Sequence, residues 1–135
     1  MDIHTLRLLD IHPSQFYISR TKLEAVRSWF DSSALCGFQP LPVRLLCGRP
    51  VFTDGHTRAL AAYLAGLDRV PLVWDEDELD WDAYQLCVDA CESRGVQTIA
   101  DLRCRILPQE EYAVKWNGWC DDMQEVLALQ RRDGK

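Results

Sequence analysis

Residues 54–58 read Asp-Gly-His-Thr-Arg and lie at the centre of the stretch that decides the fold, Leu41 to Asp75. Two apolar runs that begin at Leu41 and Val51 come before them, and the segment Cys47-Gly-Arg-Pro50 separates those runs. Apolar and β-branched residues around a Gly- and Pro-containing turn are typical of a short β-hairpin. The pattern therefore predicts a hairpin immediately before residue 54.

A short helix and another strand are predicted after these five residues. Ala59 to Ala65 is rich in Ala and Leu, and Gly66 is suited to end that helix. Val70 to Trp74 then returns as an apolar strand. Asp54 to Arg58 thus lies where a strand passes into a helix N-terminus, at which free backbone N–H groups and the helix dipole favour an anion.

The side chains of this junction suit a phosphate site. Gly55 permits a tight turn close to a ligand, and Thr57 can donate a hydroxyl hydrogen bond. Arg58 can contact phosphate oxygens with two N–H groups at once. Asp54 can hold Mg²⁺ or accept a proton, and His56 can donate to phosphate or take part in proton transfer. We therefore predict phosphate binding by Gly55, His56, Thr57 and Arg58, with Asp54 and His56 as the catalytic candidates.

Each of these residues also has a purely structural interpretation. Asp-Gly is a common turn pair, and Asp54 and Thr57 can hydrogen-bond the local backbone. A histidine at a helix start is more often a surface hydrogen-bonding residue, and Arg58 can form a surface ion pair with the acidic residues that follow. Their combination at one strand-to-helix junction is what favours phosphate binding.

The composition is that of an ordinary globular chain. Its 135 residues are expected to form one domain, and 47% of them are hydrophobic and 27% charged. The formal net charge is −6 and the 15 basic residues are scattered, so direct nucleic-acid binding is not expected. No apolar run approaches the length of a membrane span, and Met1 to His12 lacks the pattern of a signal peptide. We therefore expect a cytoplasmic protein without membrane contact.

Six cysteines are spread through the chain without a C-x-x-C pair, which disfavours a zinc site and a thioredoxin-type redox site. Cys87 and Cys91 lie four residues apart on a predicted helix, so they share a face and are expected to be buried thiols. We predict six reduced thiols and assign no metal ligands.

A strand and an amphipathic helix are predicted before the central stretch. The strand covers Leu6–Ile11 and ends at His12-Pro13, because proline removes a hydrogen-bond donor and restricts the residue before it. Thr21 and Glu24 match a capping box with Thr21 as the N-cap, and apolar residues recur at helical spacing up to Phe30.

An acidic stretch follows the central one, with six acidic residues among the eight from Asp75 to Asp82. Carboxylates suit the first turn of a helix, so this pattern favours a solvated helix start over a metal- or amine-binding site. Helices are then predicted over Asp82–Arg94, from Ile99 to Leu107 with Thr98 as N-cap, and from Pro108 to about Gln130 with an interruption at Asn117-Gly118. The last helix carries a stripe that is expected to pack on the core: Tyr112, Trp116, Trp119 or Cys120, Met123 and Leu127.

Val51 to Val73 resembles the core motif of the ParB/sulfiredoxin superfamily: a strand, a G-x-x-R turn, an Ala-rich helix ending near a Gly, and a strand opening with a Val-Pro step. The resemblance covers about residues 5–75. It implies an α+β fold, with a small mixed sheet packed against helices over 1–75 and a helical C-terminal extension over 76–135 of the same domain. It also implies that Gly55, His56, Thr57 and Arg58 hold nucleotide phosphates.

The turn is most similar to that of the free-serine kinase branch, which reads Asp-Gly-His-His-Arg and differs only at Thr57. These kinases transfer a nucleotide phosphate to free serine, and they carry a catalytic Glu where this chain has Gln15, which cannot act as a base. His56 stands where sulfiredoxins carry their catalytic Cys, so their thiol chemistry is not expected. Partition ParB proteins bind and hydrolyse CTP but add a helix-turn-helix domain, which this short, acidic chain does not match.

Two main functions follow, with one further alternative. The first is a phosphotransferase or nucleotide hydrolase that binds ATP, ADP or CTP with Mg²⁺ and acts on a small hydroxyl-bearing substrate. The second is a non-catalytic nucleotide-sensing or protein-interaction module, which Gln15 favours. A partition-type protein that reaches DNA through a partner ranks lowest, because the net charge is −6. The oligomeric state is not predicted.

Overall fold

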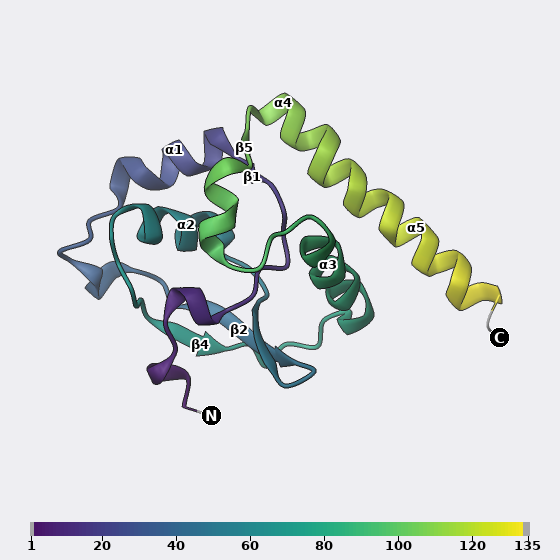
Figure 1. The fold of residues 1–135 in the computed structure, drawn as a ribbon, viewed down its shortest axis with the longest axis horizontal. Helices are drawn as coiled ribbons and strands as arrows, with labels where there is room; N and C mark the ends of the chain where they lie inside the picture. The colour runs from purple at the N-terminus through teal and green to yellow at the C-terminus, as the bar shows by residue number, and fades with distance from the viewer. Residues whose placement is uncertain (1, 134–135) are drawn as a thin grey trace.

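The centre of the fold is the sheet formed by the predicted hairpin and the strand that follows it. In the computed structural model, which describes residues 2–133, β2 (Leu41–Leu46) pairs antiparallel with β3 (Arg49–Phe52). β4 (Leu72–Trp74) pairs parallel with β2, so the strand order is β3-β2-β4. This mixed sheet lies beneath the helices in Figure 1, and the predicted α+β class is confirmed.

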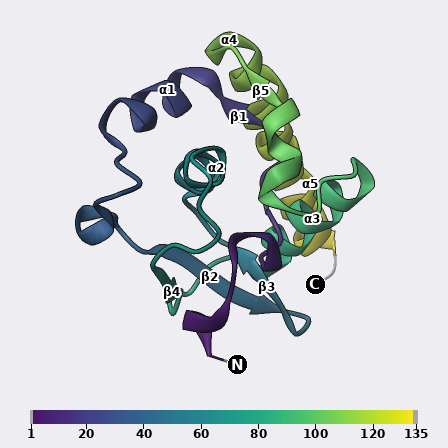
Figure 2. The same cartoon turned by 60° about the vertical axis from the view of Figure 1, so that its left-hand side comes forward.

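α2 (His56–Leu64) lies over the sheet in the middle of the molecule. Figure 2 shows it nearly end-on, surrounded by α1, the sheet and the C-terminal helices. Gly66 has φ 88° and ends the helix in a Schellman motif, in which the Leu67 N–H donates to Ala62 O, as predicted for a glycine at this position. More than half of the side chains of α2 are buried: His56, Ala59, Leu60, Ala61 and Ala62.

The N-terminal segment differs from the strand predicted over Leu6–Ile11. It forms the short 3₁₀ helix η2 (Leu8–Asp10), and another 3₁₀ turn, η1 (Ile3–Thr5), precedes it. The Asp10 carboxylate accepts a backbone N–H from three residues earlier (2.8 Å), which closes the chain into a turn where a strand would have extended it. Strand-like pairing is reduced to one isolated bridge between His12 and β3.

α1 (Arg20–Trp29) confirms the predicted amphipathic helix, but its N-cap is Ser19 rather than Thr21. Ser19 Oγ accepts the Lys22 N–H at 3.3 Å. Serine and threonine are both good N-caps, and the pairing of the preceding strand sets which of them starts the helix. The loop that follows α1 contains the 3₁₀ turn η3 (Leu35–Gly37).

A second, two-stranded sheet joins the two halves of the chain. β1 (Ile18–Ser19) pairs parallel with β5 (Ile106–Leu107). The helix predicted from Ile99 to Leu107 therefore ends earlier, as the 3₁₀ helix η4 (Ile99–Cys104), and its predicted N-cap Thr98 is confirmed. The last two residues of that prediction are strand because β1 offers their backbone a partner.

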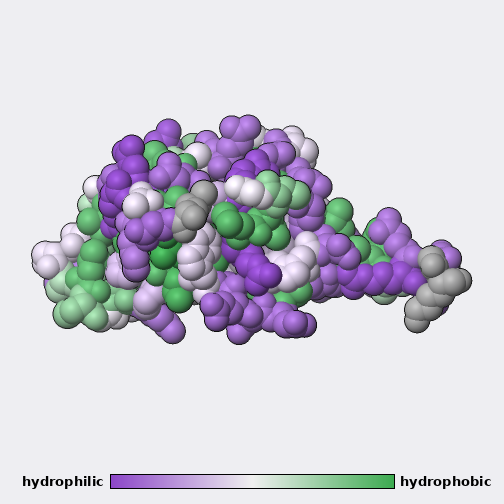
Figure 3. All heavy atoms as spheres, turned by 90° about the horizontal axis from the view of Figure 1, so that it is seen from below, coloured by the Kyte–Doolittle hydropathy of each residue, from purple (hydrophilic) through white to green (hydrophobic). Residues whose placement is uncertain are grey.

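The C-terminal extension is helical, as predicted. α3 (Trp81–Ser93) is followed after η4 by α4 (Gln109–Tyr112), one π-helical turn η5 (Ala113–Asn117) and α5 (Gly118–Asp133). The interruption predicted near residue 117 is therefore this π-helical turn, which offsets the two helices. α5 runs along the molecule and its end projects beyond the body as a narrow arm (Figures 1 and 3). The predicted stripe faces the core, with four buried members: Tyr112, Trp116, Met123 and Leu127.

Two further expectations concern composition. All six cysteines are free thiols, and Cys87 and Cys91 are buried on α3 as predicted. Within residues 2–133, no helix is long and apolar enough to cross a membrane.

Candidate functional site

The junction at residues 54–58 has the predicted form, and Gly55 makes it so. Gly55 is the N-cap of α2 and adopts the left-handed conformation, φ 75° and ψ 20°. A Cβ at this position would lie 2.7 Å from the buried Leu41 Cδ2 and 3.0 Å from Arg58 Nη2. Asp54 Oδ1 accepts the Gly55 N–H at 2.8 Å and holds the turn. Only glycine fits both the conformation and the space.

The N-terminus of α2 leaves its backbone donors available. The Gly55 cap provides no side-chain hydrogen bond, and the first intrahelical bond runs from Ala59 N–H to Gly55 O at 2.9 Å. The N–H groups of His56, Thr57 and Arg58 therefore have no acceptor within the helix. They lie at its positive end, where an anion is favoured.

A cavity of about 420 Å³ lies beside this N-terminus, between α1, α2 and Tyr112. Two cations line it, Lys22 from α1 and Arg58 from α2, and we refer to it as the cation-lined cavity. Among the residues that the structure describes, Asp54 is the one carboxylate in its lining. The full lining is Gln15, Lys22, Ala25, Val26, Asp54, Gly55, His56, Thr57, Arg58 and Tyr112.

Both cations are held by aromatic and backbone partners. Arg58 Nη1 donates to Gln39 O at 2.6 Å, and its guanidinium lies 5.9 Å from the centre of the Phe38 ring. Lys22 Nζ lies 5.2 Å from the centre of the Tyr112 ring. Neither Lys22 nor Arg58 forms an ion pair within residues 2–133, so both charges are free to meet an anion.

His56 is buried rather than exposed, at 4% of its accessible area. Its Nε2 accepts the Ser14 N–H at 2.9 Å, which leaves the ring proton on Nδ1. Burial lowers the pKa of His56 from 6.5 to about 4, with a smaller opposing effect from Asp54. The ring is therefore neutral at pH 7, and it ties the segment before β1 to the start of α2.

Gln15 lines the cation-lined cavity. Its Nε2 donates to Tyr17 O at 2.8 Å and to Tyr112 Oη at 3.1 Å. The amide therefore links the segment before β1 to the C-terminal extension. Lys22 and Tyr112 are site residues that the sequence did not indicate, because neither lies near the 54–58 motif in the chain.

A second cavity, of about 240 Å³, lies on the other side of Gln15, Asp54 and His56. Residues of α3, η5 and α5 form most of its lining, and five of them have apolar side chains, so we refer to it as the apolar cavity. The sequence did not predict it. Its full lining is Ser14, Gln15, Thr53, Asp54, His56, Ala83, Tyr84, Cys87, Trp116, Cys120, Met123 and Gln124.

The acidic stretch has structural roles in the fold. Asp75 Oδ2 accepts the Thr53 hydroxyl at 2.6 Å, and Asp80 caps α3 by accepting the Ala83 N–H at 3.2 Å. Asp80 also pairs with Arg131 at 2.7 Å, and these hydrogen bonds lower the pKa of its carboxyl group. Within the described part of the chain, no three His, Cys, Asp or Glu side chains converge as a metal site would require.

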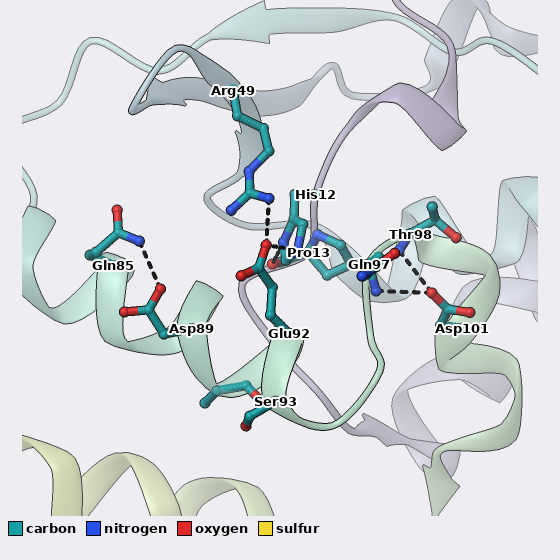
Figure 4. Close-up of polar contacts among 11 residues, drawn as sticks. His12, Pro13, Arg49, Gln85, Asp89, Glu92, Ser93, Gln97, Thr98 and Asp101 are labelled. Carbon is teal, nitrogen blue, oxygen red and sulfur yellow. Dashed lines mark hydrogen bonds and ion pairs between the residues drawn. The ribbon is translucent and has the colours of Figure 1, made fainter.

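A second buried histidine, His12, does not line either cavity, and Figure 4 shows its polar contacts. Its Nδ1 lies 2.7 Å from Pro13 O, and its Nε2 lies 3.7 Å from Glu92 Oε1, which Arg49 also contacts. Burial is the largest cause of the lowered pKa of His12. Residues 12–14 are thus held at one end by contacts to α3 and at the other by His56.

Comparison with protein-family models and with curated proteins finds no match to this chain. Among solved structures, the protein Atu1540 from Agrobacterium tumefaciens is similar over 72% of this chain, at 18% identity and a TM-score of 0.45. The chain spans 59% of the length of that protein. The function is therefore inferred from the geometry of the site.

Proposed function

We propose that this protein binds the phosphate groups of a nucleoside tri- or diphosphate in the cation-lined cavity. One observation carries the proposal: the free N–H groups of α2, Arg58 and Lys22 surround a single space of about 420 Å³. The chain as a whole carries a net charge of −6. The excess of positive charge in this cavity is therefore opposite in sign to the net charge of the protein. The resemblance of the 54–58 motif to the ParB/sulfiredoxin superfamily supports a nucleotide as the source of the phosphates.

The residues of the cavity also suit a nucleotide that carries Mg²⁺. Asp54 is exposed, and its Oδ1 accepts the Gly55 N–H, whereas its Oδ2 accepts no hydrogen bond from the residues that the structure describes. Mg²⁺ is commonly held by one or two carboxylates together with phosphate oxygens. Asp54 is the residue that would hold it here, and the ion would neutralise charge between the phosphates.

Whether binding leads to phosphate transfer depends on Asp54 and Gln15. In a transferase or hydrolase, Asp54 accepts the proton of the attacking hydroxyl or water, because Nε2, the acceptor nitrogen of the His56 ring, is already hydrogen-bonded to the Ser14 N–H. In a nucleotide-sensing module, no such step occurs. The amide of Gln15, hydrogen-bonded to Tyr112 where the serine kinases carry a base, favours the sensing function.

The binding proposal is tested by calorimetric titration of ATP, ADP, CTP and GTP, with and without Mg²⁺. Arg58→Ala removes a charged donor, so the affinity for the bound nucleotide should fall by about 10- to 100-fold, equivalent to roughly 1.5–3 kcal/mol. Arg132→Ala on α5 is the matched control, since it removes the same charge from an exposed position outside the cavity. Equal affinities in wild type and Arg58→Ala, with both folded by circular dichroism, would show that the phosphates bind elsewhere.

Catalysis is tested separately on the wild type by ³¹P NMR with the nucleotide that binds. Release of inorganic phosphate, or formation of a phosphate ester in the presence of a hydroxyl compound, supports the enzyme, and Asp54→Asn should then abolish it. Tight binding with unchanged nucleotide over hours supports the sensing module.

A further inference from the structure

The apolar cavity shares a wall with the cation-lined cavity and differs from it in chemistry. Gln15, Asp54 and His56 line both spaces, so a molecule in one lies across these side chains from a molecule in the other. The remaining interior of the apolar cavity comes chiefly from the C-terminal extension, including Trp116 of η5 and Met123 of α5.

One side of the cavity is formed by packed aromatic rings and thiols. The Trp116 ring packs edge-on against Phe16, with centroids 4.9 Å apart, and stacks on Trp119 at 5.7 Å. Burial raises the pKa of Cys87 to about 12 and that of Cys120 to about 11, so both are neutral thiols that behave as small apolar side chains. A fixed aromatic wall and neutral thiols favour an apolar body against them.

The charge of the cavity restricts the polar part of its occupant. No Lys or Arg lines it among the residues that the structure describes, and Asp54 is its one ionised side chain. A carboxylate placed here would find no cation and would face the Asp54 carboxylate. An uncharged hydroxyl, or an amine, meets acceptors instead, because Asp54 and the Gln15 and Gln124 amides present oxygen atoms.

The volume of the apolar cavity restricts the size of a ligand. An apolar cavity of about 150 Å³ is known to accept benzene. The space here is about 240 Å³, which holds one ring with a short side chain, or an aliphatic group of similar bulk.

We propose that the apolar cavity binds the phosphate acceptor: a small uncharged or amine-bearing molecule with a ring-sized apolar body and a hydroxyl group that faces Asp54. This inference rests on the proposed nucleotide binding and on the transferase form of the proposed function. The acceptor oxygen forms a bond to the terminal phosphorus of the nucleoside triphosphate, the bond from that phosphorus to the bridging oxygen breaks, and a nucleoside diphosphate leaves. The hydroxyl proton passes to Asp54. A free amino acid such as serine does not fit this description, because its carboxylate would have no cation to meet.

The two methionines of the chain provide a selective readout. With [methyl-¹³C]methionine, Met123 reports from the lining of the apolar cavity, and Met1 gives the other methionine signal. The probes are 2-phenylethanol, phenethylamine and phenylacetate, which have similar size and are neutral, cationic and anionic. We expect saturable shifts of the Met123 methyl signal with the first two, and at least tenfold weaker binding of phenylacetate.

Cys120→Phe tests the location, because it places a ring in the cavity from a partly exposed position on α5. It should abolish the shifts, whereas Leu129→Phe, on the exposed part of the same helix, should preserve them. If Cys120→Phe does not fold, Gln124→Trp at the exposed rim provides the same test. Shifts that persist in the folded cavity-filling variant would overturn the location.

Titration of Mg-ATP into the same samples separates this inference from the proposed function. If the nucleotide binds while the Met123 signal stays unchanged with all three probes, the apolar cavity is not a ligand site and the nucleotide site stands. Phenylacetate binding as tightly as 2-phenylethanol would overturn the charge argument. If both ligands bind, ³¹P NMR should show a phosphate ester of 2-phenylethanol, and its absence would overturn the acceptor role. If no nucleotide binds, the acceptor role falls together with the proposed function.

Discussion

The two cavities meet at Asp54 and His56, yet they are built in different ways. The cation-lined cavity takes half of its lining from the contiguous residues 54–58, and it carries two cations. The apolar cavity is assembled from four separate parts of the chain, at residues 14–15, 53–56, 83–87 and 116–124, and carries none. One cavity thus depends on a local motif, and the other on the packing of the C-terminal extension against the core.

The largest effect is expected from Gly55→Ala, which acts on the local motif. The new Cβ would lie 2.7 Å from Leu41 Cδ2 and would force alanine into a left-handed conformation. Strain of about 1 kcal/mol and overpacking of about 2 kcal/mol should lower the free energy of unfolding by about 3 kcal/mol, measured by urea denaturation. Nucleotide affinity should fall as well, since the α2 N-terminus must shift.

Gly48→Ala separates strain from packing. Gly48 has φ 76°, close to that of Gly55, but no atom lies within 4 Å of its hypothetical Cβ. The free energy of unfolding of Gly48→Ala should therefore fall by the strain alone, about 1 kcal/mol. If the free energy of unfolding falls equally in both variants, Leu41 can move aside at no cost, and the space at Gly55 does not restrict the side chain.

The same contrast explains which features were predictable from sequence. The hairpin, α2 with its glycine stop, and the junction at residue 54 follow from local turn and capping chemistry, and all three are present in the fold. The strand predicted over Leu6–Ile11 was wrong, because a side-chain bond from Asp10 closes a turn that apolar periodicity does not reveal. Ile106 and Leu107 were assigned to a helix, because their partner strand lies almost 90 residues earlier. Lys22 and the apolar cavity could not be predicted for the same reason: only tertiary packing brings them to Asp54.

The shared wall between the cavities should make stability depend on pH through His56. Its pKa is lowered from 6.5 to about 4 in the folded protein, so the unfolded chain binds the proton more readily. The contribution to stability is fully present above pH 6.5 and is lost as the pH falls towards 4. Between pH 7 and pH 5 the loss should be about 2 kcal/mol in the free energy of unfolding.

His56→Gln isolates this contribution. Its amide oxygen can accept the Ser14 N–H but does not titrate, while His12 remains and titrates in both proteins in the same direction. The variant should be less stable at pH 7 and should lose about 2 kcal/mol less than wild type on going to pH 5. If the free energy of unfolding depends on pH in the same way in both proteins, the pKa of His56 is not lowered in the folded protein.

Gln15→Glu adds a carboxylate to the wall that the two cavities share. The change removes the amide donor to Tyr17 O, which should cost about 1 kcal/mol, while the Tyr112 hydroxyl can donate to the new carboxylate. If the site differs from the serine kinases only by its base, transfer of phosphate from ATP to a hydroxyl acceptor should appear or increase, as followed by ³¹P NMR. Bound nucleotide with unchanged turnover would show that more than one carboxylate separates this site from a kinase.

The smallest effect is expected from Lys22→Gln, which changes only the cation-lined side. Lys22 Nζ lies 5.2 Å from the centre of the Tyr112 ring. Its ammonium group is a point charge and cannot make the two parallel N–H contacts with a phosphate that the Arg58 guanidinium can make. Mg-ATP affinity should fall by about threefold to tenfold at low salt, and this difference should shrink as ionic strength rises, because exposed charges are screened. The Met123 methyl shift with 2-phenylethanol should not change, since Lys22 does not line the apolar cavity. A matching loss of 2-phenylethanol binding would mean that the two cavities respond as one site, and the separation by Gln15, Asp54 and His56 would have to be abandoned.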